Sequence, residues 1–258
     1  MTNTKSIFEV YAHEYDFITN AAQRESYHAK EVAALIERFK PTRALDAGCA
    51  SGLTTLLLAR QGIEAVGLDR SKPILEVARR TRGPESKAGK GLPISFVAGS
   101  FEKLPAKMNQ TFDLVVCLAN SISGVGSLSN LRLSLKNFHN VLRPGGVLVL
   151  QMLNYTAVTE NRLMPIKATQ NGKVVYERFT ERQGKSMYIY VTRADFGQTP
   201  PQFEIFRHQF DNFSPSQVDG GIRRAGFSSI RTYGDLYMKK RFGAKSRDLV
   251  VVATRGAN

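Results

Sequence analysis

Two carboxylates stand at the ends of apolar, strand-like runs in the first third of the chain. Asp46 lies in the run 43–47, and Asp69 ends the run 64–69, 23 positions later. Ligands of doubly wound sheets bind beyond the carboxyl ends of the strands. An acid about 20 residues after a glycine loop is the usual acceptor for ribose hydroxyls. The pair therefore indicates a nucleoside ligand.

The loop between these runs consists of small residues, "GCASG" at 48–52, so that its backbone can approach a ligand closely. Its spacing fits neither the dinucleotide pattern G-x-G-x-x-G nor the phosphate loop G-x-x-x-x-G-K-[ST]. An acid two positions before the first glycine would repel pyrophosphate and suits a cationic ligand. S-adenosylmethionine has an ammonium and a sulfonium group and no phosphate.

Alternating helices and strands must position these residues. Helical patterns are expected at 5–39, 53–61, 71–81, 127–142 and 214–227, with a turn at 143–146, and strands at 43–47, 64–69, 94–100, 112–120, 147–153, 229–238 and 247–255. Several strands are apolar throughout, which is typical of a parallel sheet covered on both faces. The sequence predicts an α/β fold with a doubly wound, mostly parallel seven-stranded sheet.

The pattern changes after residue 153. Three long strand-like segments, 173–182, 186–196 and 203–213, follow one another without a helix. Such segments cannot extend a parallel sheet and predict an antiparallel meander. We therefore expect a core built from 1–153 and 214–258, with 154–213 inserted as an antiparallel β lid over the substrate.

Four blocks of sequence together resemble the class I S-adenosylmethionine-dependent methyltransferases. They are "LDAGCASG" (45–52), "VGLD" (66–69), "FDLVV" (112–116) and "LRPGGVLVL" (142–150). The run "CLANSISGV" (117–125), followed by a helix and "RPGGVLVLQMLNY", further resembles the glycine N-methyltransferase branch, which acts on small molecules. The resemblance implies a Rossmann-like methyltransferase fold and S-adenosyl-L-methionine as cofactor.

The resemblance also implies a set of site residues. Asp69 would accept hydrogen bonds from the ribose hydroxyls, and Asp46 would help to orient the methionine part. The residues expected to bind the cofactor are Tyr11, Asp46, Gly48, Cys49, Ala50, Gly52, Asp69, Arg70, Ser100, Phe101, Leu118 and Asn120. The residues expected to contact the methyl acceptor are Tyr15, Asn120, Tyr155, Tyr176 and Tyr190. No metal site and no catalytic residue are assigned.

Some of these positions depart from the family or have a structural alternative. Ala50 stands where the family often has glycine, which alanine can replace at a negative φ. Ser100 stands where many members have an acid that binds the adenine amino group. Asp69 could instead cap the helix that begins near Ser71. For Tyr11, packing of an amphipathic helix explains the spacing equally well.

The acceptor is expected to be a small molecule that is methylated on nitrogen. An amine only has to arrive neutral, whereas a phenol must lose a proton to a base. No histidine or carboxylate stands out in the sequence as that base, although a folded pocket could assemble one from distant residues. The expected activity is that of an S-adenosylmethionine-dependent methyltransferase.

The charge of the chain keeps two other functions open. Lys and Arg number 36 against 22 Asp and Glu, a net charge of +14, which raises nucleic acid as a partner. An RNA-modifying methyltransferase is therefore one alternative, and a cofactor-binding protein without transfer activity is another. The densest basic groups, 79–82, 223–224 and 238–241, are not interleaved with an RNA-binding aromatic pattern. A small-molecule acceptor is favoured for that reason.

Composition also sets the expected setting of the protein. The start of the chain lacks an apolar core like that of a signal peptide, and no run of about 18 apolar residues exists. The two cysteines, Cys49 and Cys117, lie in apolar contexts and are expected to be reduced and to have packing roles. We expect a cytoplasmic protein, a monomer or a homodimer, without a membrane partner.

Overall fold

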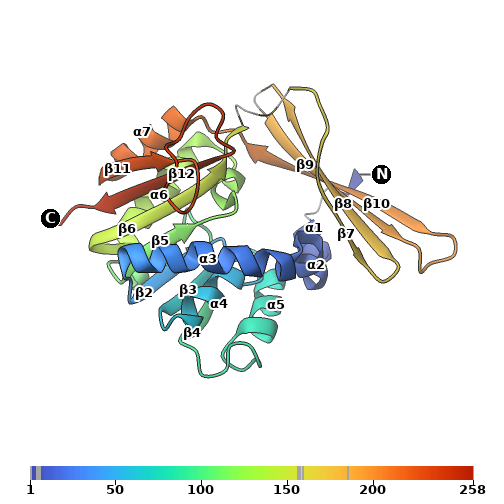
Figure 1. Ribbon diagram of the computed structural model, residues 1–258, viewed down its shortest axis with the longest axis horizontal. Helices are drawn as coiled ribbons and strands as arrows, with labels where there is room; N and C mark the ends of the chain where they lie inside the picture. The colour runs from blue at the N-terminus through green and yellow to red at the C-terminus, as the bar shows by residue number, and fades with distance from the viewer. Residues whose placement is uncertain (1, 4–6, 156–157, 159, 185, 258) are drawn as a thin grey trace.

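The computed structural model describes residues 2–3, 7–155, 158, 160–184 and 186–257. Two β-sheets with helices around them form the structure (Figure 1). The larger is the core sheet, and the other is called the second sheet below. Among the described residues, no helix combines the length and hydropathy that crossing a bilayer requires.

The core sheet has seven strands in the order β11-β12-β6-β5-β2-β3-β4. Their bounds are β2 (Arg43–Ala47), β3 (Glu64–Asp69), β4 (Ile94–Ala98), β5 (Phe112–Cys117), β6 (Leu142–Leu153), β11 (Phe227–Tyr233) and β12 (Asp248–Arg255). All neighbouring strands are parallel except the two pairs that β12 forms. The predicted α/β fold with a mostly parallel seven-stranded sheet is confirmed.

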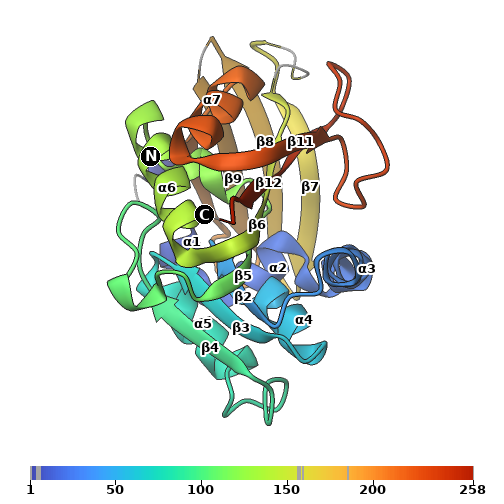
Figure 2. The same ribbon diagram turned by 90° about the vertical axis from the view of Figure 1, so that its left-hand side faces the viewer.

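Helices cover both faces of the core sheet, as Figure 2 shows. One face packs against α3 (Ala21–Phe39), α4 (Leu53–Arg60) and α5 (Lys72–Arg82), and the other against α6 (Leu128–Val141) and α7 (Pro215–Ala225). Successive side chains of a strand point to opposite faces. Accordingly, Leu45 packs with the α6 and α7 side, whereas Ala44 packs with the α3 and α4 side. This two-sided burial explains why the strands are apolar throughout.

The segment 143–146 differs from the turn that the sequence predicts. Strand β6 already begins at Leu142, which pairs with Phe112, and the next pair is Leu114 with Val147. The extra residues of β6 form an irregularity in the ladder, where Gly145 adopts a φ of 80°. Helix α6 still ends where expected, because the chain becomes extended at Leu142.

The second sheet has the order β1-β10-β9-β8-β7. Its strands are β1 (Thr2–Asn3), β7 (Met164–Asn171), β8 (Val174–Gln183), β9 (Ser186–Asp195) and β10 (Gln202–Asp211). Strands β7 to β10 pair antiparallel, and β1 pairs parallel with β10. The sequence pattern missed β7, whose side chains are mostly exposed or half-exposed. It also placed the start of the chain in the core, whereas Thr2–Asn3 pairs with the second sheet.

The second sheet lies beyond the carboxyl ends of the parallel strands, because the chain enters it after the end of β6. Figure 1 shows α1 (Ile7–Val10) and α2 (Tyr15–Thr19) between this sheet and helix α5. A short 3₁₀ turn, η1 (Ala12–Glu14), joins these helices. We call the face of the second sheet that meets this N-terminal segment its inner face. Even-numbered residues of β8 and β10 and odd-numbered residues of β9 share that face, as the strand register requires.

Candidate functional site

A cavity of about 680 Å³ lies between the carboxyl ends of the core strands, the N-terminal helices and the inner face of the second sheet. The residues predicted from the sequence that line it are Tyr15, Asp46, Gly48, Cys49, Ala50, Asp69, Arg70, Ser100, Phe101, Leu118 and Asn120. They come from the ends of β2, β3, β4 and β5 and from α2. The topology thus brings most of the predicted cofactor residues to one place.

The loop after β2 presents its backbone to this cavity. The N–H groups of Gly48 and Cys49 both donate to the carbonyl of Leu68, at 2.8 and 3.0 Å. Gly48 has a φ of +83°, and a Cβ atom there would lie 2.6 Å from the side chain of Ser121. Gly52 does not line the cavity. It begins α4 at a φ of +86°, where a Cβ would lie 2.6 Å from the Phe96 ring.

Ala50 has a backbone conformation that the sequence did not predict. Its φ is +47°, in the left-handed region, so the condition of a negative φ is not met. That region costs an L-residue roughly 1–2 kcal/mol. The N–H of Ala50 donates to the Asp69 carboxylate at 2.9 Å, which helps to hold the residue there. The cost explains why glycine would be the more comfortable residue at this position.

The Asp69 carboxylate accepts hydrogen bonds from two backbone N–H groups. One carboxylate oxygen accepts the N–H of Ala50 and the other accepts the N–H of Ser71, both at 2.9 Å. Asp69 therefore does hold the start of α5, as the structural alternative suggested. Each carboxylate oxygen can accept more than one hydrogen bond. The half-buried side chain borders the cavity with acceptor capacity left for a ligand.

Asp46 is a buried acid on the cavity wall, with 2% of its surface exposed. Burial raises its pKa to about 6, although a hydrogen bond from the Thr55 hydroxyl, at 2.6 Å, favours the charged form. Nearby, His28 contacts Thr54 and Glu31 through its two ring nitrogens, each at 2.9 Å. A cationic group of a ligand would stabilise the Asp46 carboxylate.

The cavity also contains residues that the sequence reasoning missed. They include Arg24 and His28 from α3, Arg178 from β8, Ile189 from β9, and His208 and Phe210 from β10. The Nε of Arg24 is buried without a hydrogen-bond partner, and no ion pair involves Arg24 among the described residues. Arg24 and His28 stand four positions apart in the sequence, a spacing that places both on one helix face. That spacing was the signal that could have found them.

The two cysteines have the packing roles that the sequence predicted. Cys49 and Cys117 are both free and buried. Burial raises the pKa of each thiol well above its usual range, so the thiolate form is disfavoured. Cys49 borders the cavity as a neutral, apolar group.

Asn120 and Tyr155 tie the ends of two core strands together. Asn120 donates to the Tyr155 hydroxyl, and its carbonyl oxygen accepts the N–H of Leu153 at 3.0 Å and the Ser123 hydroxyl at 3.1 Å. Tyr155 is 3% exposed and does not line the cavity. The Asn120 side chain is thus largely engaged inside the protein, although the residue still borders the cavity.

Tyr11 and Tyr176 lie where the N-terminal helices pack against the inner face of the second sheet, outside the cavity. Tyr176 donates a hydrogen bond to Glu14, and Tyr11 donates one to Glu204. The Arg193 guanidinium lies over the Tyr11 ring, 4.6 Å from its centre. Neither tyrosine lines the cavity. They bind the N-terminal helices to the second sheet instead.

Tyr190 points away from the cavity because side chains alternate along a strand. Its neighbour Ile189 lines the cavity, whereas the Tyr190 hydroxyl donates to Glu181 at 2.9 Å on the opposite face. The expected acceptor contacts Tyr155, Tyr176 and Tyr190 are therefore not brought to the cavity. On the inner face, Arg178, Ile189 and His208 occupy that place.

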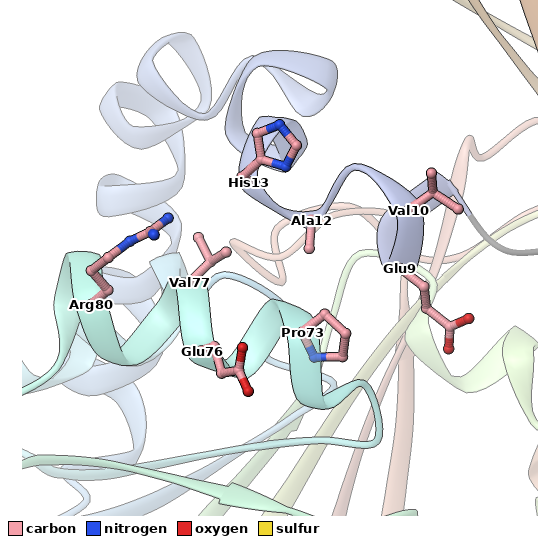
Figure 3. Close-up of a pocket in the computed structure, with 8 residues that line it drawn as sticks. All are labelled: Glu9, Val10, Ala12, His13, Pro73, Glu76, Val77 and Arg80. Atoms are coloured by element: carbon pink, nitrogen blue, oxygen red, sulfur yellow. The ribbon is translucent and has the colours of Figure 1, made fainter.

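A second hollow, of about 340 Å³, lies on the other side of the N-terminal helices (Figure 3). Glu9, Val10, Ala12 and His13 of the N-terminal segment line it, together with Pro73, Glu76, Val77 and Arg80 of α5. Its charged groups have both signs, and it contains none of the nucleoside determinants. The described residues include no group of three or more potential metal ligands, here or elsewhere.

Comparisons with known proteins match this chain to methyltransferases. Residues 45–150 match the family described as methyltransferase domain. The glycine/sarcosine N-methyltransferase of Aphanothece halophytica is 22% identical over 88% of this chain and 82% of its own length. The glycine N-methyltransferase of Mus musculus is 26% identical over 58% of this chain. This chain covers 53%, about half, of the length of that protein.

Solved structures share the fold. The CcbJ methyltransferase from Streptomyces caelestis superposes with a TM-score of 0.73 at 20% identity, covering 88% of this chain and 89% of its own. SAM-bound CalS10, an amino pentose methyltransferase from Micromonospora echinaspora, gives 0.68 at 22% identity, with coverages of 98% and 99%. The family match covers the glycine loop, Asp69, the whole of β3 to β5 and most of β2 and β6. The chain therefore contains a methyltransferase domain at 45–150 and has the fold of the class I S-adenosylmethionine-dependent methyltransferases.

Proposed function

We propose that this methyltransferase transfers the methyl group of S-adenosylmethionine to a nitrogen atom of a small molecule. The observation that carries the proposal is the cavity that the glycine loop, Asp69 and the unpaired Arg24 share. Relatives named as glycine and sarcosine N-methyltransferases support nitrogen as the acceptor atom. A structural neighbour named as a sugar N-methyltransferase agrees with that choice.

The donors and acceptors around the cavity suit the cofactor. Asp69 would accept hydrogen bonds from the ribose hydroxyls, and the backbone at 48–50 would lie along the methionine part. Asp46 would face the ammonium group, and Arg24, whose buried Nε lacks a partner, would bind the carboxylate. Ser100 and Phe101 would border the adenine. When bound, the cofactor supplies a methyl group that its sulfonium already activates.

The protein would then contribute mainly alignment and exclusion of water. We assign the segment 154–213 to a lid, because its inner face closes the cavity with Ile166, Ile189 and Phe210. Well-oriented reactants can gain on the order of 7–11 kcal/mol relative to free ones. The lid would hold the acceptor nitrogen in line with the methyl group while apolar side chains exclude water.

His208 is the group that would accept a proton from the acceptor amine. It lines the cavity on β10, and its ring makes no hydrogen bond to another described residue. Its ring packs against Phe210, 4.7 Å between centres. Burial, and then the charge of Arg70, lower its pKa below the usual 6.5, so the neutral imidazole dominates at pH 7.

Replacing His208 with glutamine should lower kcat by about 10- to 100-fold at pH 7, because general-base catalysis typically contributes 10²–10⁴ and a fraction of the amine arrives neutral. The parent should lose kcat/KM as the pH falls through the His208 pKa, since the protonated ring cannot act as a base. The variant should lack that limb of the profile. Methyl transfer followed from pH 5 to 9 measures both effects. Identical profiles would show that His208 only shapes the cavity.

Cofactor binding should weaken in acid because Asp46 must be ionised to face an ammonium group. With a free pKa of about 6 and a lower one in the complex, the affinity for S-adenosylhomocysteine should fall about fourfold from pH 7.5 to 5.5. Asp46→Asn should bind more weakly at pH 7.5 and lose this dependence. Calorimetric titrations across the range test this, and an unchanged slope in Asp46→Asn would contradict it.

Two experiments test the proposed function as a whole. Calorimetry should show binding of S-adenosylmethionine and S-adenosylhomocysteine, and no binding of NAD. Methyl-labelled cofactor should then label a small amine in a fractionated cell extract. Label that appears in RNA, or cofactor binding without transfer to any fraction, would support the two alternative functions instead. The cytoplasmic location and the monomeric or homodimeric state stay predictions.

A further inference from the structure

Arg178 differs from the other arginines in the strands of the second sheet. Arg182 pairs with Glu160 at 3.0 Å, Arg193 with Asp195 at 3.2 Å, and Arg207 stacks on a tyrosine ring at 3.9 Å. Arg178 has no ion pair and no side-chain hydrogen bond among the described residues, and its Nε, like that of Arg182, is buried without a partner. It nevertheless lines the cavity from the inner face. A partly buried guanidinium without a partner is costly unless a ligand supplies the anion.

Arg24 lies close enough to Arg178 for their positive charges to repel each other. Burial lowers the pKa of Arg178, and the positive charge of Arg24 lowers it further. Tyr15 lies near both arginines on the cavity wall. Two partly buried guanidinium groups that form no ion pair with any described residue thus line one cavity, and each makes the other less favourable until an anion binds.

The cofactor cannot balance both guanidinium groups. It brings one carboxylate, while its ammonium and sulfonium groups add positive charge. Arg24 belongs to α3, the helix whose His28 contacts Thr54 just after the glycine loop, so Arg24 lies on the cofactor side. Arg178 belongs to the opposite wall, the second sheet. Carboxylates also line the cavity, but none of them forms an ion pair with Arg178 among the described residues, so the second anion would come from the acceptor.

We propose that Arg178 determines acceptor specificity by binding an anionic group, a carboxylate or a phosphate, of the amine that is methylated. This inference rests on the proposed nitrogen transfer. Arg178 pairs with Val191 in the strand register, and His208 pairs with Ile189 on the next row of the same face. Strand β9 separates the strands of Arg178 and His208, so their backbones are roughly 10 Å apart in the direction across the sheet. A compact acceptor can therefore reach both.

Anion binding tests the proposal without requiring transfer. Acetate and inorganic phosphate would be titrated into protein saturated with S-adenosylhomocysteine, and their relative affinities would distinguish a carboxylate from a phosphate site. Arg178→Gln should weaken the better anion by at least about tenfold, and Arg178→Lys should retain part of it. Arg182→Gln is the matched control, because it removes a charge from the same strand and face but outside the cavity. It should bind like the parent.

The affinity for S-adenosylhomocysteine tests whether Arg178 binds the acceptor or shares the cofactor carboxylate with Arg24. It should stay within about threefold of the parent in Arg178→Gln, a change of about 0.65 kcal/mol or less. Parallel loss of cofactor affinity would assign Arg178 to the cofactor carboxylate and overturn the proposal. Absence of anion binding by the parent, or equal binding by Arg178→Gln, would overturn it as well.

Transfer assays with matched acceptors separate this inference from the proposed function. Glycinamide replaces the carboxylate of glycine with a neutral amide, and aminomethylphosphonate replaces it with a phosphonate, so each variant is compared with the parent on the same acceptor. Arg178→Gln should lower kcat/KM for the anionic amines by at least about tenfold, mainly through KM, and leave glycinamide within about twofold. Equal losses on charged and neutral amines would refute the role of Arg178 while nitrogen transfer stands. Label found only on oxygen or carbon, with anion binding intact, would refute nitrogen transfer alone.

Discussion

Replacing Asp69 with alanine should weaken the binding of S-adenosylmethionine by about 1–3 kcal/mol, or roughly 5- to 150-fold. The side chain borders the cavity and keeps acceptor capacity after its bonds to the N–H groups of Ala50 and Ser71. Its loss removes a charged partner for the ribose hydroxyls and releases the Ala50 backbone from its left-handed conformation. Calorimetry with the cofactor and its demethylated product measures the effect.

Two controls separate the role of Asp69 in binding the cofactor from its role in holding the Ala50 loop and the start of α5. Asp69→Asn keeps the shape and one carbonyl acceptor but lacks the charge, so it should fall between the parent and the alanine variant. Thermal unfolding without ligand reports how far the loop and the start of α5 depend on the side chain. A folded Asp69→Ala variant with parental cofactor affinity would leave Asp69 a purely structural role.

Replacing Arg193 with glutamine should destabilise the fold by about 3 kcal/mol, in the range for breaking a buried ion pair. Arg193 is 9% exposed. Its guanidinium lies 3.2 Å from Asp195 and 3.8 Å from each of Glu14 and Glu204, and it donates to the Tyr176 hydroxyl at 3.1 Å. The variant leaves these carboxylates close together without their shared cation. Urea unfolding measures the free energy.

The same substitution should loosen the N-terminal helices, because Glu14 and Tyr11 are bound to the second sheet through this cluster. Limited proteolysis should cut before residue 20 more readily in the variant, and cofactor affinity should fall with it, since Tyr15 lines the cavity. Arg207→Gln is the control, since Arg207 is exposed on the outer face. If Arg193→Gln loses no more stability than Arg207→Gln, Arg193 does not hold the N-terminal helices against the second sheet.

The fold and the grouping of the glycine loop with two acids around one cavity could be predicted because their signals are local. Apolar runs identify strands that are buried on both faces, and Leu45 and Ala44 do pack on opposite sides of the core sheet. The glycine loop and Asp69 follow strands directly, and parallel strands bring their carboxyl ends to one edge. Short-range sequence order was therefore enough to place Asp46, Gly48 and Asp69 around one cavity.

The conformation of single loop residues was beyond such reasoning. Ala50 adopts a positive φ although its residue type disfavours it, because contacts from Asp69 and the neighbouring backbone outweigh the local cost. The side-chain amide of Asn120 likewise donates a hydrogen bond to Tyr155, a residue 35 positions away in the sequence. Bonds between distant segments decided both cases.

The acceptor side depended on the tertiary structure for a geometric reason. A strand pattern tells that alternate residues share a face, but not which face will be covered by which part of the chain. For this reason Ile189 lines the cavity in place of the expected Tyr190. Tyr176 is covered by the N-terminal helices, whereas Arg178, on the same face, lines the cavity. The sequence by itself determined the core fold and the local glycine-loop and acid pattern for the cofactor. The packing of the N-terminal helices against the second sheet decided which side chains of that sheet line the cavity.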